Sequence, residues 1–136
     1  MRVTFPSGTR STPLDRNPST VNVGATASAT AGQDNLVTSY TVPANRRADL
    51  AVQTTLVVAV ALAAAQVGRS EILGPGSVLI HLAELEPLAP IGTRADSPSI
   101  HVQLTAGITI TIRVVAGAGA GQVIVSGGIQ GVEYDA

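Results

Sequence analysis

Apolar and polar residues alternate along much of the chain after residue 35, with the period of two that is typical of half-buried β-strands. The clearest segments are 99–104 and 108–114, in which Ile, Val or Leu occupies every second position. A third segment, 46–60, begins with the same alternation and ends in an apolar run. Because successive side chains of a strand point to opposite faces, this pattern predicts strands with one face in a core.

Turn residues divide this part of the chain into short pieces. The strands predicted between them are 36–42, 46–60, 68–73, 77–85, 99–104, 108–114, 122–126 and a last one that follows Gly127-Gly128 and runs through Tyr134. The short link 105–107 predicts an antiparallel hairpin between its two flanking strands. Seven to nine short strands, without a long helix or an internal repeat, predict an all-β fold: an antiparallel two-sheet sandwich of jelly-roll type over residues 36–136.

One stretch is ambiguous. Residues 59–66 are rich in alanine, the best helix former, and short apolar runs do not separate helix from strand. We favour a strand that runs into a loop over a short helix.

Residues 1–35 differ from the rest of the chain. They are rich in Ser, Thr, Pro, Gly, Ala and Asn and show no sustained period. Such a segment buries too little apolar area to offset its ordering entropy, so it is either disordered or lies along a partner. The sequence therefore predicts an extended N-terminal arm over 1–35, with Phe5 and Leu14 among the anchors if the arm docks.

Composition narrows the function. Apolar residues make up 45% of the 136-residue chain and aromatic residues 2%, so the core is expected to consist of Val, Ile, Leu and Ala. The net charge is −1 and all eight cations are arginines scattered along the chain, which argues against binding to nucleic acid. No cysteine is present, which fits assembly in a reducing cytoplasm.

The longest apolar run, 56–65, is shorter than the roughly 18–20 residues that a membrane helix needs. The N-terminus lacks the apolar core of a secretion signal. We therefore expect neither a membrane partner nor export by this route.

Candidate chemistry is sparse. The best metal candidates, His81, Glu84 and His101, do not suit one site, because positions three apart on a strand face opposite ways. The pair Glu84 and Glu86 lacks the setting of an acid–base pair, and the glycine-rich turns lack the Lys-Ser/Thr of a phosphate loop. The sequence predicts no enzyme activity and no cofactor.

Several small apolar residues fall on the outward positions of the predicted strands: Ala51, Val57, Ala59 and Val115. They lie either on subunit interfaces or on a second covered side of each strand, and the sequence favours neither.

Two motifs carry a family resemblance. Residues 39–48, SYTVPANRRA, resemble the opening strand and turn Y-T-V-P-A-N-(K/R)-R-A of small β-sandwich proteins in tailed bacteriophages. Residues 104–110, LTAGITI, are similar to the L-x-A-G-x-x-I turn and strand of the same proteins. Size, arm and strand count look most like the cement, or head decoration, proteins on the outside of phage capsids.

The resemblance implies a virion protein on the outer capsid surface that bridges subunits of the major capsid protein and stabilises the expanded head. It also implies self-association, for which we favour a dimer over a trimer because two-fold closure is the commonest arrangement. Four arginines are candidates for capsid contacts, although ordinary solvated arginine is an equal alternative: Arg46, Arg47, Arg69 and Arg94.

Two other functions stay open. The first is a phage tail or receptor-binding module that recognises a host surface glycan. The scarcity of aromatic platforms, limited to Phe5, Tyr40 and Tyr134, counts against it. The second is a cupin-like enzyme, which two isolated histidines do not support.

Overall fold

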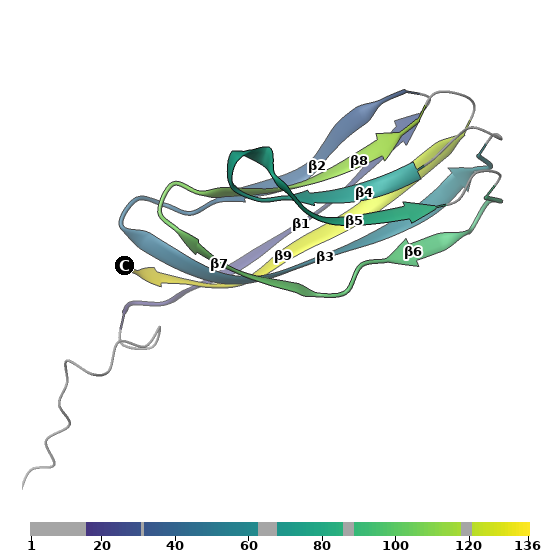
Figure 1. Ribbon diagram of the computed structural model, residues 1–136. Helices are drawn as coiled ribbons and strands as arrows, with labels where there is room; N and C mark the ends of the chain where they lie inside the picture. The colour runs from purple at the N-terminus through teal and green to yellow at the C-terminus, as the bar shows by residue number, and fades with distance from the viewer. Residues whose placement is uncertain (1–15, 31, 63–67, 86–88, 118–120) are drawn as a thin grey trace, which may run out of the picture.

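The computed structural model describes residues 16–30, 32–62, 68–85, 89–117 and 121–136 (Figure 1). This part of the chain forms strands and one short 3₁₀ turn. The elements are β1 (Ser19–Thr30), β2 (Asp34–Thr41), β3 (Arg46–Val60), β4 (Gly68–Leu73), η3 (Pro75–Ser77), β5 (Leu79–Leu85), β6 (Arg94–Asp96), β7 (Ile100–Thr105), β8 (Thr109–Ala116) and β9 (Gln122–Asp135).

The strands form two antiparallel sheets that face each other, as Figure 1 shows. Sheet A has the order β1-β9-β3, with β6 and β7 both paired to the far side of β3. Sheet B has the order β2-β8-β4-β5. The expected all-β sandwich is confirmed.

The pairing is nested, as if one long hairpin had been rolled up. β4 pairs with β5, β3 with β6 and β7, β2 with β8, and β1 with β9. Successive pairs alternate between sheet B and sheet A, which is the arrangement of a jelly roll. In this roll β6 and β7 act as one edge strand that is interrupted at Ser97-Pro98-Ser99.

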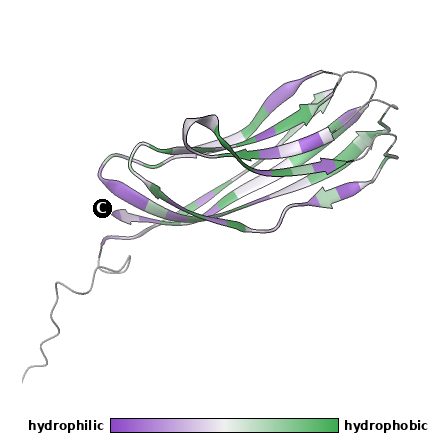
Figure 2. Cartoon of the chain, in the orientation of Figure 1, coloured by the Kyte–Doolittle hydropathy of each residue, from purple (hydrophilic) through white to green (hydrophobic). Residues whose placement is uncertain are grey.

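The core lies between the sheets and follows the alternation in the sequence. Every second residue of β3 from Ala48 to Val58 is buried, and so is every second residue of β8 from Ile110 to Ala116. Figure 2 shows the same alternation of apolar and polar residues along the strands. Burial of each Leu or Ile side chain contributes about 1.5–3 kcal/mol, so these positions carry the fold.

The N-terminal boundary is not where the sequence placed it. The predicted arm, 1–35, is wrong for its second half, because residues 19–30 form β1 and pair with β9 along their whole length. The inward positions of β1 from Val21 to Ala29 are filled mainly by alanine, which is too weakly apolar to reveal a period of two. Residues 1–15, with Phe5 and Leu14, lie outside the described residues, so an arm there stays a prediction.

The hairpin predicted around 105–107 is also wrong. β7 pairs with β3 in sheet A, whereas β8 pairs with β2 and β4 in sheet B. The link instead crosses between the sheets and is held by Val42, whose N–H donates to Ile108 O (3.0 Å) and whose carbonyl accepts from Gly107 N (2.9 Å). A short link fits either connection, so its length does not identify the partner strand.

Gly127 and Gly128 do not form the expected turn, because β9 continues through them. A Cβ at Gly127 would lie 2.7 Å from Ile112 Cδ1 and 3.4 Å from Val37 Cγ1, both on sheet B. The glycine therefore permits close packing of the two sheets. The ambiguous stretch 59–66 is strand as far as Val60, and residues 63–67 lie outside the described residues.

Candidate interaction surfaces

The outward positions of sheet A form a surface that we call the sheet A face. Over β1 and the middle of β3 and β9 most of its side chains carry hydroxyl or amide groups: Thr20, Asn22, Thr26, Ser28, Gln53, Thr55, Ser126 and Gln130. Charged and aliphatic side chains lie toward its ends, among them Arg47, Asp49, Val57 and Ile124. Neighbouring strands share hydrogen bonds across it, one between the hydroxyls of Thr26 and Ser126 (3.0 Å) and one from Gln130 Nε2 to Asn22 Oδ1 (3.5 Å).

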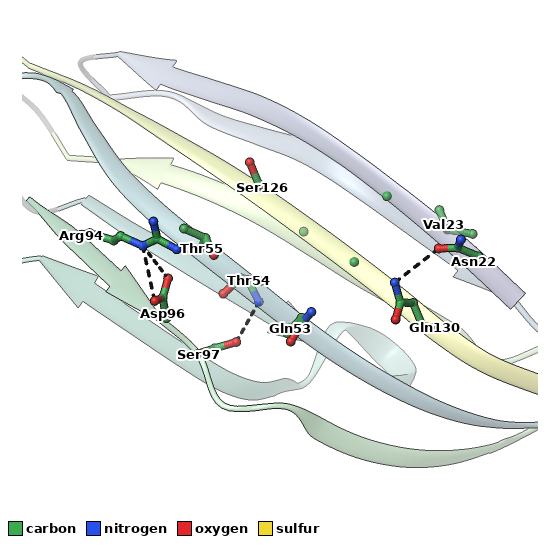
Figure 3. Close-up of a pocket in the computed structure, with 13 residues that line it drawn as sticks. Asn22, Val23, Gln53, Thr54, Thr55, Arg94, Asp96, Ser97, Ser126 and Gln130 are labelled. Carbon is green, nitrogen blue, oxygen red and sulfur yellow. Dashed lines mark hydrogen bonds and ion pairs between the residues drawn. The ribbon is translucent and has the colours of Figure 1, made fainter. Parts of the chain in front are cut away.

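A hollow of about 460 Å³ crosses the middle of the sheet A face (Figure 3). Gly24 of β1 pairs with Gly128 of β9, which pairs with Gln53 of β3, so two adjacent positions of this row have no side chain. The floor is therefore bare strand backbone. We call this hollow the polar trough; other residues around it include Asn22, Thr55, Arg94, Asp96, Ser126 and Gln130.

One wall of the polar trough is formed by β6. Arg94 and Asp96 form an ion pair at its rim (3.1 Å), with both side chains more than half exposed. Ser97, beside them, is buried and its hydroxyl accepts a hydrogen bond from Thr54 N (2.8 Å), which fixes the end of β6 against β3 (Figure 3). The trough thus offers donors and acceptors in balance, with no net charge from its rim.

The outward positions of sheet B form a different surface, the sheet B face. Asp34 and Arg113 form an ion pair (2.8 Å) between β2 and β8. On β4, Arg69 Nε lies 3.2 Å from Glu71 Oε2, as an ion pair without hydrogen-bond geometry. Aliphatic side chains lie among these charges: Leu36, which is 57% exposed, and the half-buried Leu73, Leu82 and Val115.

A cluster of polar contacts closes the end of the sandwich where the C-terminus lies. The Arg46 guanidinium pairs with Asp135 (2.7 Å) and Glu133 (3.7 Å) of β9, and donates to Asn17 O (2.9 Å) and Ser19 Oγ (3.2 Å) before and in β1. It therefore joins β1, β3 and β9 inside one chain.

Tyr40 links the same end to sheet B. Its hydroxyl donates to Glu133, so β2 of one sheet is tied to β9 of the other. Partial burial of Tyr40, together with the hydrogen bond to the negatively charged Glu133, raises the pKa of its phenol well above the usual range. The hydroxyl thus acts as a structural donor.

The structure does not bring the predicted contact residues together. Arg46 is committed to contacts inside the chain, and Arg69 lies on the sheet B face beside Glu71. Arg47 is exposed on the sheet A face, and Arg94 lies on the rim of the polar trough. As capsid contacts, the four arginines stay predictions.

Sequence reasoning missed the polar trough. Gly24 and Gly128 are neighbours only through the pairing of β1 with β9, and the predicted arm left β1 out of the sandwich. The candidate metal residues also separate: within the described ranges no three His, Asp or Glu side chains gather to hold a metal ion. In the same residues no helix has the length and apolar character to cross a membrane.

No protein-family model matches this sequence, and no curated protein matches it either. Among solved structures, the sandwich is similar to a chain in the acid-stable capsid of Helicobacter pylori bacteriophage KHP30, with a TM-score of 0.50 and 13% identity over 88% of this chain and 99% of that chain. It is also similar to part of dimeric latent PorU from Porphyromonas gingivalis, with a TM-score of 0.54 and 9% identity over 82% of this chain and 13% of that one.

A third similar structure is that of infectious bursal disease virus, Gx strain, with a TM-score of 0.49 and 14% identity over 87% of this chain. This chain spans 32% of the length of that viral chain. At these identities the likeness shows the fold alone. The protein has a jelly-roll-like β-sandwich, a fold that a chain of the bacteriophage KHP30 capsid and part of PorU also have.

Proposed function

We propose that this chain is a structural virion protein that binds the outside of a phage capsid and cements neighbouring subunits of the major capsid protein. The observation that carries the proposal is the match to the bacteriophage KHP30 capsid chain, 99% of which is covered. A phage capsid thus holds a chain that is little more than such a sandwich. The phage-like motifs at 39–48 and 104–110 agree with this assignment.

The sheet B face is the surface that suits a capsid subunit. Most of its charges already pair within the chain, as Asp34 does with Arg113, so these meet a partner without leaving an unmatched ion. Leu36 and Val115 beside them supply apolar area to bury. Many copies that each add a modest interface stabilise a shell by mass action, with no catalytic residue needed.

The test is co-sedimentation with capsid shells of the phage whose genome carries this chain. We expect saturable binding to expanded shells. Leu36→Lys on the sheet B face should weaken binding about tenfold, as for a residue near an interface centre. Ser126→Lys, on the sheet A face, is the matched control and should bind normally. Failure to bind expanded or unexpanded shells would rule the proposal out.

The predicted N-terminal arm is tested in the same assay. A chain that lacks residues 1–15 should fold, because β1 begins at Ser19, and should bind expanded shells more weakly because one tethered contact is lost. Equal binding by the full and shortened chains would remove the arm from the proposal and leave the sandwich as the binding unit.

A second candidate function is recognition of a host surface glycan, and the polar trough favours it. Sugar hydroxyls need both donors and acceptors, which Gln53, Gln130 and the Arg94–Asp96 pair provide above a glycine floor. None of the residues that line the trough is aromatic, so the capsid proposal ranks first. Isothermal titration calorimetry with neutral oligosaccharides tests this function. Binding that is lost in Asp96→Ala would support the glycan site, and the absence of a binding signal with every sugar would rule it out.

A further inference from the structure

β5 leaves a strand edge open in sheet B. It pairs with β4 on one side, and no strand in the described residues pairs with its other side. The chain just before and at the start of β5 is also the longest run of exposed aliphatic side chains there: Val78 is 64% exposed, Leu79 47% and Ile80 40%. An open edge and exposed apolar side chains therefore coincide.

The turn before β5 holds these side chains in place. Gly74 N donates to Val78 O (2.8 Å) and Ser77 N to Gly74 O (3.1 Å) around η3. The pairing of β4 with β5 then shifts, so that Leu79 lies opposite Leu73 while Ile80 has no opposite residue. A bulge of this kind re-aims a side chain, and here it keeps the aliphatic groups outward on an ordered backbone.

The neighbouring edge, in sheet A, is protected in ways that β5 is not. The edge formed by β6 and β7 is interrupted by Pro98 and carries the Arg94–Asp96 pair. Within β5 itself only His81 and Glu84 are ionisable, and Glu84 lies opposite Arg69 of β4. Natural edge strands usually carry lysine, proline or inward charge to prevent pairing.

We infer that the β5 edge, with Val78, Leu79 and Ile80, is the contact surface for a second copy of this chain. The two β5 strands pair antiparallel about a two-fold axis, so the same patch serves both copies and both open edges are closed at once. An axis near Ile80 places Val78 opposite Leu82 of the other copy and keeps the two Glu84 carboxylates from facing each other. Two four-stranded sheets then become one continuous sheet across the dimer.

The first test measures mass against concentration for the purified chain, by analytical ultracentrifugation without shells or sugars. We expect a reversible dimer in the range of about 1–100 µM. Val78→Lys should weaken the dimer at least about tenfold, because it places a charge in the apolar contact. Leu36→Lys is the matched control: it has similar exposure on the opposite edge strand of sheet B and should dimerise normally.

The second test uses the absence of cysteine from the sequence, so that a single introduced thiol has one possible partner. Under mild oxidation Ile80→Cys should form a covalent dimer, because an axis near Ile80 brings the two copies of this position close. Ser39→Cys on β2 should not. A chain that stays monomeric, or that cross-links equally at position 39, would overturn the inference.

This inference and the capsid proposal are tested separately. Dimerisation is measured in the purified chain, whereas cementing is measured by binding to shells. A monomer whose shell binding is lost in Val78→Lys would overturn the inference and assign the edge to the capsid subunit instead.

Discussion

The two outer faces of the sandwich share a backbone geometry and differ in chemistry. Both consist of the outward positions of their strands. The middle of the sheet A face carries mainly hydroxyls, amides and two bare glycine positions, with the Arg94–Asp96 pair at the rim of the polar trough. The sheet B face carries two ion pairs among aliphatic side chains. The inward half of each strand is nearly uniform in both sheets. The alternate positions thus separate two tasks, one half specifying the fold and the other specifying the partners.

The largest expected difference between an inward and an outward position is between two adjacent glycines of β9. Gly127→Val should lower the free energy of unfolding by about 3 kcal/mol, because its side chain would enter the core against Ile112. Gly128→Val should change stability by less than about 1 kcal/mol, since nothing lies within 4 Å of the added Cβ. It would fill the polar trough instead. Urea unfolding measures the stability of both variants. If both lost the same amount of stability, the assignment of Gly127 to the core and of Gly128 to the outer face would be wrong.

Two adjacent arginines give the next largest effect. Arg46→Ala removes the contacts that join β1, β3 and β9 and leaves Glu133 without its cation, so unfolding should require about 2 kcal/mol less. Arg47→Ala alters an exposed side chain and should stay within about 0.5 kcal/mol. Thermal and urea unfolding compare them. If both variants were equally stable, the contacts of Arg46 with β1 and β9 would not stabilise the fold.

Much of the fold was accessible from the sequence, because Val, Ile and Leu mark the inward positions of β3 and β8 strongly enough to give strands and burial. β1 was not predicted, because alanine fills most of its inward positions and because its partner β9 lies at the other end of the chain. The turn predicted at Gly127 was wrong for a related reason. A glycine that permits close packing of sheets looks, in sequence, the same as one that makes a turn.

The surfaces were harder to predict than the fold. The polar trough exists only because Gly24 and Gly128 become neighbours, and the role of Arg46 depends on acids of β9 far along the chain. The pattern of outward positions does not identify a partner, so a subunit interface and a second covered side were equally supported for Val115. The open edge of β5 follows from strand order, which local patterns do not encode.

Tyr40 tests whether its hydrogen bond to Glu133 holds the two sheets together at the end of the sandwich that Arg46 closes. Its pKa is raised in the folded chain by burial and Glu133, whereas in the unfolded chain the phenol ionises near pH 10. Above about pH 10 the unfolded state therefore binds fewer protons, and stability should fall as pH rises, by at most about 1.4 kcal/mol per pH unit.

The measurement uses the Tyr134→Phe chain, in which Tyr40 is the only tyrosine. Tyrosinate absorbance should appear at a higher pH in the folded protein than in the protein unfolded in urea. Tyr40→Phe should remove this part of the alkaline loss of stability. A phenol that ionises at the same pH in both states would contradict the link between β2 and β9.

The smallest expected effect is a difference in how side-chain couplings on the two faces respond to salt. A double-mutant cycle with Asp34→Asn and Arg113→Gln should give a coupling of about 0.5 kcal/mol, since both side chains are more than a third exposed. This coupling should fall in 1 M salt, where the Debye length is about 3 Å. The matched cycle on the sheet A face, Thr26→Ala with Ser126→Ala, removes a hydrogen bond between neutral hydroxyls, and its coupling should hold in the same salt. If both couplings responded alike, the two faces would not differ in the electrostatic character that assigns one to a protein partner and the other to a neutral polar ligand.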